Sequence, residues 1–87
     1  MIDPGTKERI DLLFALEDRA EAERCILDEC EASLRIQYAV LKVSEGTLQG
    51  LREAIKLKNT DWRDLLMAAG FGHDVEKHLS WLPESQS

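Results

Sequence analysis

The sequence has few residues that interrupt helices and no long apolar run. Its 87 residues include only two prolines and five glycines, which favours helices over many short strands. It has no run of about 18 apolar residues, and no apolar segment of the signal-peptide type follows the N-terminus. We therefore expect no transmembrane segment, no membrane partner and a cytoplasmic location.

Positive charge is also scarce, with 11 Lys and Arg against 17 Asp and Glu and a net charge of −6. The imbalance lies entirely in residues 1–31, which hold four basic and ten acidic side chains. Such a negative potential disfavours contact with a phosphate backbone, so nucleic acid is not an expected partner. The acidic segment predicts a solvated face, and docking to a basic partner surface is the alternative.

The length and composition indicate one folded domain. The apolar share of 44% and the charged share of 32% are typical of a globular chain. A chain of this size buries only roughly 60% of its unfolded surface, so association with a partner would add stability. We expect a single helical domain over residues 1–87, with flexible ends at 1–5 and 84–87.

Periodic apolar residues predict an all-α fold, a compact bundle of four or five helices. From Lys7 onward no Gly or Pro occurs until Gly46, which favours long helices. A stripe with steps of mostly three and four predicts a first helix that is bent or exposed in its middle. The stripe consists of Leu13, Leu16, Ala20, Leu27, Cys30 and Leu34. The predicted helices cover about 6–30, 33–43, 47–58, 61–69 and 74–82.

Residues 34–43 fit two structures. Apolar and polar residues alternate from Leu34 to Val40, which is typical of a half-buried strand. The same residues also repeat at steps of three and four, which is typical of a buried helix. Helix is favoured because a lone strand leaves its backbone groups without partners. The alternative is an α+β fold in which this strand pairs with another copy across a dimer.

Capping residues mark the expected helix ends. Gly70 suits the left-handed position after a helix, which would bring Phe71 back against Leu66. Polar residues are expected to cap the other helices: Asp3 or Thr6, Ser44 or Thr47, Thr60, and Asp74. We expect four residues in the core: Leu51, Leu66, Phe71 and Leu79.

Residues 36–83 resemble a type of small, uncharacterised bacterial protein. The resemblance rests on Ala39–Lys42, Ser44–Gly46, Asp61–Leu66 and Ala68–Phe71, with His78 and Trp81–Pro83 completing it. It implies a bacterial, cytosolic origin and a helical fold. It implies no activity and no site residue.

The sequence offers no recognisable chemistry. Cys25 and Cys30 would point about 140° apart on a helix, too far for a disulfide, and their acidic neighbours should raise the thiol pKa. His73 and His78 are five residues apart, whereas zinc ligands on one helix face are three or four apart. We therefore expect no enzyme activity, no catalytic residue, no metal and no cofactor.

With enzyme, metal and cofactor chemistry not expected, the sequence favours a protein-interaction or self-association module. Trp62, Arg63, His78 and Trp81 are the candidate recognition residues, although Trp62 shares the face of Leu65, Leu66 and Ala69 and is expected in the core. The alternative is a regulatory domain with a ligand pocket near Trp62, Phe71, His78 and Trp81. Self-association is expected as a homodimer with antiparallel first helices, through Ile10, Leu13, Phe14 and Leu16.

Overall fold

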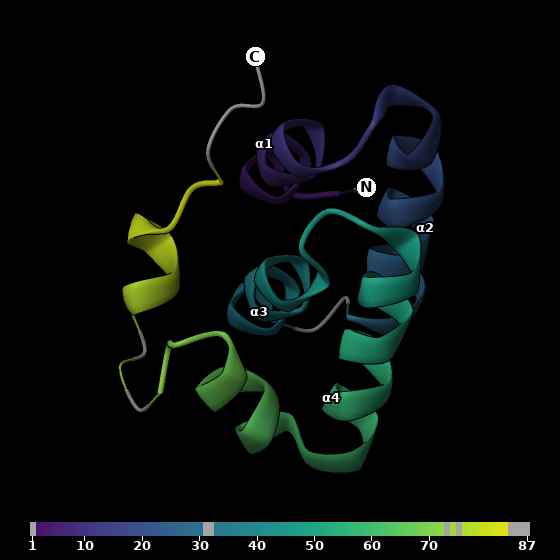
Figure 1. The fold of residues 1–87 in the computed structure, drawn as a ribbon. Helices are drawn as coiled ribbons and strands as arrows, with labels where there is room; N and C mark the ends of the chain where they lie inside the picture. The colour runs from purple at the N-terminus through teal and green to yellow at the C-terminus, as the bar shows by residue number, and fades with distance from the viewer. Residues whose placement is uncertain (1, 31–32, 73, 75, 84–87) are drawn as a thin grey trace.

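A computed structural model describes residues 2–30, 33–72, 74 and 76–83 of the chain. The predicted all-α class is confirmed, because these residues form four α-helices and two 3-10 helices and no strand (Figure 1). The elements are α1 (Pro4–Leu13), η1 (Leu16–Asp18), α2 (Arg19–Glu29), α3 (Leu34–Ser44), α4 (Leu48–Ala68) and η2 (Lys77–Ser80). Within the described residues, no helix has the length and apolarity that crossing a bilayer requires.

Helix α3 lies in the middle of the molecule (Figure 1). Its most extensive packing is against α4, and it also contacts α1 and η2. Five consecutive residues of α3, from Gln37 to Leu41, are buried. A helix enclosed in this way must be apolar on more than one face, and this explains why its sequence also resembles a strand. The helical interpretation of residues 34–43 is confirmed, and the strand alternative is wrong.

Helix α1 begins at Pro4, two residues before the predicted start. Asp3 caps it, since its Oδ2 accepts hydrogen bonds from the backbone N–H of Gly5 at 2.9 Å and of Thr6 at 3.4 Å. Pro4 occupies the first helical turn, where a missing N–H costs nothing. Part of the predicted flexible end at residues 1–5 is therefore ordered. Met1 and the predicted tail at 84–87 lie outside the described residues.

The prediction of one helix over residues 6–30 is wrong. Phe14 and Ala15 have extended backbone angles and separate α1 from η1 and α2. The break turns Phe14 inward, where it is 2% exposed, and the side chain of Arg19 donates to the Phe14 carbonyl at 3.1 Å. The predicted stripe is wrong as well, because Leu16 is 76% exposed. The residues of α2 and its end that face the core are Ala22, Ile26 and Cys30.

Helix α4 runs through both predicted helices, 47–58 and 61–69, with a kink at Asp61 between them. Thr47 caps the first half, accepting from the Gly50 N–H at 3.0 Å. Asp61 caps the second half, because its Oδ1 accepts from the N–H of Arg63 at 3.0 Å. The prediction of Thr60 as this cap is wrong, since its hydroxyl donates to the Lys56 carbonyl.

The predicted ending of α4 at Gly70 is confirmed. Gly70 has a φ of +78°, in the left-handed region. The N–H of Phe71 donates to the Leu66 carbonyl at 3.0 Å, and that of Gly70 to the Met67 carbonyl at 3.0 Å. These two bonds define a Schellman motif, which turns the chain back so that Phe71 and Leu66 enter the same core.

The predicted helix over 74–82 is only the 3-10 helix Lys77–Ser80. Asp74 accepts from the Glu76 N–H at 2.9 Å, which makes a local turn and not a helix cap. Val75 and His73 lie outside the described residues. Leu79 is 58% exposed and its prediction as a core residue is wrong, because this short helix buries His78 against the core instead.

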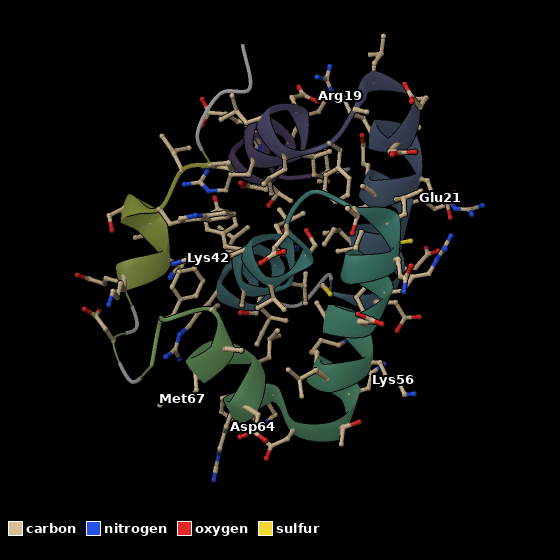
Figure 2. All side chains as sticks on the ribbon, viewed as in Figure 1. Arg19, Glu21, Lys42, Lys56, Asp64 and Met67 are labelled. Atoms are coloured by element: carbon tan, nitrogen blue, oxygen red, sulfur yellow. The ribbon has the colours of Figure 1, made fainter. Side chains whose placement is uncertain are left out.

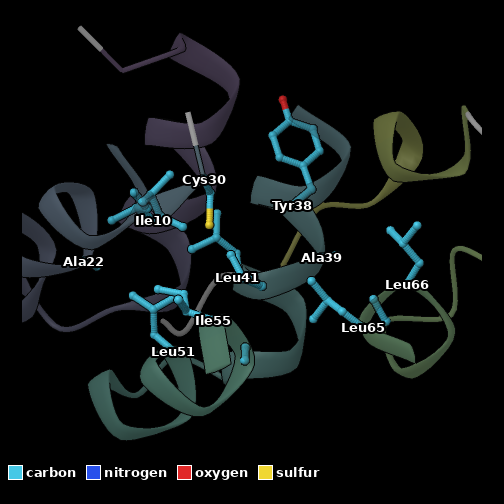
Figure 3. Close-up of a cluster of buried hydrophobic side chains, with 14 of the residues drawn as sticks. Ile10, Ala22, Cys30, Tyr38, Ala39, Leu41, Leu51, Ile55, Leu65 and Leu66 are labelled. Carbon is cyan, nitrogen blue, oxygen red and sulfur yellow. The ribbon is translucent and has the colours of Figure 1, made fainter. Parts of the chain in front are cut away.

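The core collects residues from all four α-helices, of which Figure 3 labels several, and Phe71 from the segment that follows α4. The predictions of Leu51, Leu66 and Phe71 as core residues are confirmed, with exposed fractions of 0%, 3% and 1%. A buried hydrogen bond between two side chains joins α1 to α3 within the core. The hydroxyl of Thr6 donates to Gln37 Oε1 at 2.6 Å, and Gln37 Nε2 donates to the Cys30 carbonyl at 3.0 Å.

Candidate functional site

The four residues of the predicted ligand pocket do not come together. Phe71, His78 and Trp81 do, with ring centroids 6.2 Å apart for Phe71 and His78 and 6.4 Å apart for Phe71 and Trp81. Phe71 and His78 are buried, so these rings form an aromatic layer of the core. Trp62 lies elsewhere, beside two grooves that none of the other three residues lines. The predicted composition of the pocket is therefore wrong.

Trp62 is 49% exposed, so its prediction as a core residue is wrong. Leu65, Leu66 and Ala69 of the same apolar face are buried as predicted. Trp62 stands in the first turn after the kink at Asp61, where that face extends past the core. The guanidinium carbon of Arg63 lies 5.3 Å from the centre of the Trp62 ring, within cation–π range.

Two open grooves flank Trp62. The first, of about 440 Å³, lies between the end of α2, the start of α3 and the kink of α4, and its lining includes Glu29, Arg35, Lys58, Asn59, Trp62 and Leu66. The second, of about 340 Å³, continues along the second half of α4 and is lined by Arg35, Trp62, Arg63, Leu66, Met67 and Gly72. The indole of Trp62 therefore contributes to both grooves.

The grooves have a cationic lining in an otherwise acidic protein. Among the residues that the structure describes, their charged side chains are the cations Arg35, Lys58 and Arg63 and one carboxylate, Glu29. Arg35 is positioned by a bond from its Nη2 to the Gly72 carbonyl at 2.7 Å, while its buried Nε has no hydrogen-bond partner among the described residues. Lys58 Nζ donates to the backbone carbonyl of Glu29, which fixes it beside the end of α2.

We call Arg35, Lys58, Trp62, Arg63 and Met67 the Trp62 surface. Met67 is 62% exposed and adds a flexible apolar side chain to the exposed indole. Figure 2 shows Met67 and Asp64 at the outer edge of the second half of α4. Tryptophan, methionine and arginine are the residue types enriched in protein interfaces.

Trp62 and Arg63 were predicted from the sequence as recognition residues, but the other three members of this surface were not. Arg35 lies 27 positions before Trp62, and only the packing of α3 against α4 brings them to one groove. Lys58 and Met67 stand on α4 itself, where periodicity alone marks them as ordinary polar-face residues. The local sequence carries no signal that these positions converge.

His78 and Trp81, the other candidate recognition residues, belong to the structural core. His78 is 7% exposed, and its ring centroid lies 5.4 Å from that of Tyr38. Trp81 is partly buried, and its backbone carbonyl accepts a hydrogen bond from Arg9 Nε at 3.1 Å. Both residues therefore attach the C-terminal segment to the bundle, and neither lines the grooves beside Trp62.

The predicted self-association patch does not exist as one exposed surface. Ile10 is 1% exposed and Phe14 is 2% exposed, because both pack into the chain's own core. Leu13 is partly buried against the same cluster. Only Leu16 projects outward, at 76% exposure. The first helices cannot pair through these four residues while the core is intact.

The two thiols are free, as predicted, and burial controls their chemistry. Burial raises the pKa of Cys30 to about 11, and burial followed by the nearby carboxylate of Glu21 raises the pKa of Cys25. The predicted direction is confirmed, although burial outweighs the acidic neighbours. Within the described residues, no three His, Cys, Asp or Glu side chains lie close enough together to hold a metal ion.

No protein-family model, no curated protein and no solved structure matches the chain.

Proposed function

We propose that the protein is a non-enzymatic interaction module that binds a partner protein through the Trp62 surface. One observation carries the proposal: an indole that is half exposed stands between two grooves, and most of the described charged side chains that line them are cations. Two free thiols suit a reducing compartment, which supports the proposal of a cytoplasmic location.

Trp62 is suited to anchor a partner. Tryptophan buries a large apolar area and loses little rotamer freedom, so truncation of a tryptophan at the centre of an interface often costs about 2 kcal/mol or more of binding free energy. Burial of Trp62 and Met67 together by a partner would remove two of the large exposed apolar side chains of the chain from water.

The cations around Trp62 define the chemistry of the partner. Arg35 and Arg63 present planar guanidinium groups, which bind carboxylates with paired hydrogen bonds. The partner is therefore a protein segment that carries Asp or Glu beside an apolar side chain. Nucleic acid also carries negative charge, but the net charge of −6 opposes the approach of a phosphate backbone.

A small anionic ligand is the second candidate. The first groove has about 440 Å³, within the range of roughly 300–1,000 Å³ typical of ligand sites, and it is lined by Arg35 and Lys58. A partner protein is preferred because Trp62 lines both grooves and Met67 lines the second, so that one protein segment could occupy the two together.

Selection from a random displayed peptide library tests the proposal. The wild-type protein should enrich peptides that combine acidic residues with an aliphatic or aromatic side chain. Synthetic versions of these peptides should quench or shift the Trp62 fluorescence and bind at least tenfold more weakly to Trp62→Ala. Peptides that bind Trp62→Ala and wild type equally, or a library without enrichment, would contradict the proposal.

Leu79→Ala is the matched control, because Leu79 is also exposed but lines neither groove. Peptide affinity should be unchanged in this variant. Increasing the salt concentration should weaken peptide binding, since the exposed charges of Arg63 and Lys58 are screened within about 10 Å at 0.1 M. A small anion that competes with the peptide for the first groove would instead support the ligand candidate.

A further inference from the structure

A third groove has the opposite charge from the Trp62 surface. It lies between α1 and α2, has about 740 Å³, and is lined by the apolar side chains of Ile2, Pro4 and Leu12. Within the described part of the chain, its charged lining consists of three carboxylates, Glu8, Asp11 and Glu23, and one cation, Lys7. We call these seven residues the acidic groove. It has the partner chemistry that the Trp62 surface requires, carboxylates beside apolar side chains.

We propose that the acidic groove of one copy binds the Trp62 surface of another, so that the chain associates head to tail. This inference depends on the proposed function, because it identifies the acidic partner as a second copy of the chain. Trp62 would contact Ile2 and Leu12, and Arg63 and Arg35 would face the carboxylates.

The carboxylates of the acidic groove differ in their availability. Asp11 lies 3.2 Å from Lys7 Nζ and 4.0 Å from Arg19 Nε, and Glu8 lies 3.9 Å from Arg9. Glu23 has no ion pair within 4 Å among the described residues, so none of these residues neutralises its charge by direct contact. Glu23 is therefore the expected acceptor for an arginine of the second copy.

The positions of the two surfaces exclude a two-fold contact between them. In Figure 1 helix α1 and the second half of α4 lie at opposite ends of the molecule, so a two-fold axis that joins one pair of patches leaves the other pair far apart. An interface that joins two different patches is heterologous, and each bound copy still offers one free patch. Association should consequently continue beyond a dimer, to a closed ring or an open chain. This differs from the symmetric homodimer expected from the sequence.

Two blocked variants test the proposal. Trp62→Ala/Arg63→Glu removes the Trp62 surface, and Glu8→Lys/Glu23→Lys reverses the charge of the acidic groove. In sedimentation equilibrium, the mass of the wild type should rise above 9.9 kDa as its concentration increases. Each blocked variant alone should remain near 9.9 kDa. An equal mixture should form a one-to-one complex of twice that mass and nothing larger, because only one intact interface can form.

Glu17→Lys/Glu53→Lys is the control for net charge, since it makes the same charge change at residues that line none of the three grooves. It should associate like the wild type, and circular dichroism should show that all the variants remain helical. Association that one blocked variant abolishes and the other retains, without rescue in the mixture, would overturn the head-to-tail contact in favour of a two-fold interface.

A wild-type mass of 9.9 kDa up to about 1 mM, the weak limit of specific binding, would overturn self-association altogether. The proposed function has its own readout, the Trp62-dependent binding of acidic peptides. Self-association can therefore fail while peptide binding persists, and in that case the Trp62 surface binds a different protein.

Discussion

Arg9 and Trp81 are 72 residues apart in sequence, and a hydrogen bond from Arg9 Nε to the Trp81 carbonyl joins them at 3.1 Å. Arg9 Nη1 also donates to the Gly5 carbonyl at 2.9 Å, and the guanidinium carbon lies 4.0 Å from the centre of the Tyr38 ring. The side chain is 5% exposed. One buried cation thus connects α1, α3 and the C-terminal segment.

Replacing Arg9 by Met should lower the free energy of unfolding by about 2–4 kcal/mol. Methionine keeps much of the apolar stem, but two carbonyls lose a charged donor and the Tyr38 ring loses its cation. Arg9→Lys should restore only part of this loss, because one ammonium cannot replace a planar group that binds both carbonyls. Urea unfolding measures both variants. Equal free energies of unfolding for wild type and Arg9→Met would show that the charge of Arg9 does not stabilise the fold.

The buried bond from Thr6 to Gln37 should also contribute to stability. Thr6→Val preserves the side-chain shape but removes the donor at 2.6 Å from Gln37 Oε1, and an unsatisfied buried acceptor costs about 1–3 kcal/mol. In a double-mutant cycle with Gln37→Leu, the two losses should not be additive. Strictly additive losses would mean that the two side chains do not interact in solution.

Leu66→Ala should destabilise the protein by about 2–5 kcal/mol, because Leu66 is 3% exposed in the core and its truncation leaves a cavity. Leu79→Ala makes the same chemical change at a side chain that is 58% exposed, and it should shift stability by less than about 0.5 kcal/mol. Thermal unfolding of both variants provides the comparison. Similar melting temperatures for the two variants would contradict the buried position of Leu66 at the end of α4 and the exposed position of Leu79 in η2.

Gly70→Ala should cost about 1 kcal/mol of stability. Among the described residues, a Cβ at Gly70 would meet only Lys42 Nζ, at 3.6 Å, which is an ordinary van der Waals contact. The cost comes instead from the φ of +78°, which a residue with a side chain adopts unfavourably.

Glu45 provides the opposite test, because it adopts a φ of +56° at the end of α3 although it is not glycine. Glu45→Gly should therefore leave stability unchanged or raise it by up to about 1 kcal/mol. Denaturant titration measures the stability of both variants. A neutral Gly70→Ala together with a destabilising Glu45→Gly would contradict the cost assigned to a positive φ in residues with a side chain.

The thiol of Cys30 should make stability fall at high pH. Burial raises its pKa in the folded protein from an ordinary value of 9.0 to about 11. Between these values the unfolded chain releases the proton while the folded protein retains it, so rising pH favours unfolding. The contribution is complete below pH 9 and is lost by about pH 11. Cys30→Ala should show a shallower decline of the unfolding free energy than wild type between pH 9 and 11, and parallel curves would contradict the shift.

Local chemistry was enough to predict several features of the fold. Asp3, Thr47 and Gly70 end or begin helices in the structure because a short polar side chain or a missing Cβ acts within one turn of the backbone. The all-α class follows from the scarcity of breaking residues and from periodic apolar positions. The core positions of Leu51 and Leu66 follow from the same periodicity.

Where a segment is compatible with more than one local structure, only the tertiary packing decided which one forms. No Gly or Pro near Phe14 indicates a helix end in the sequence. The helix breaks there because burial of Phe14 and packing of α2 against α4 stabilise the fold more than one continuous helix would. Exposure of Trp62 likewise depends on where the core ends, not on the face that periodicity assigns to it. The convergence of Arg35, Lys58 and Trp62 requires α2, α3 and α4 to meet, and long-range packing of this kind leaves no pattern in any one segment.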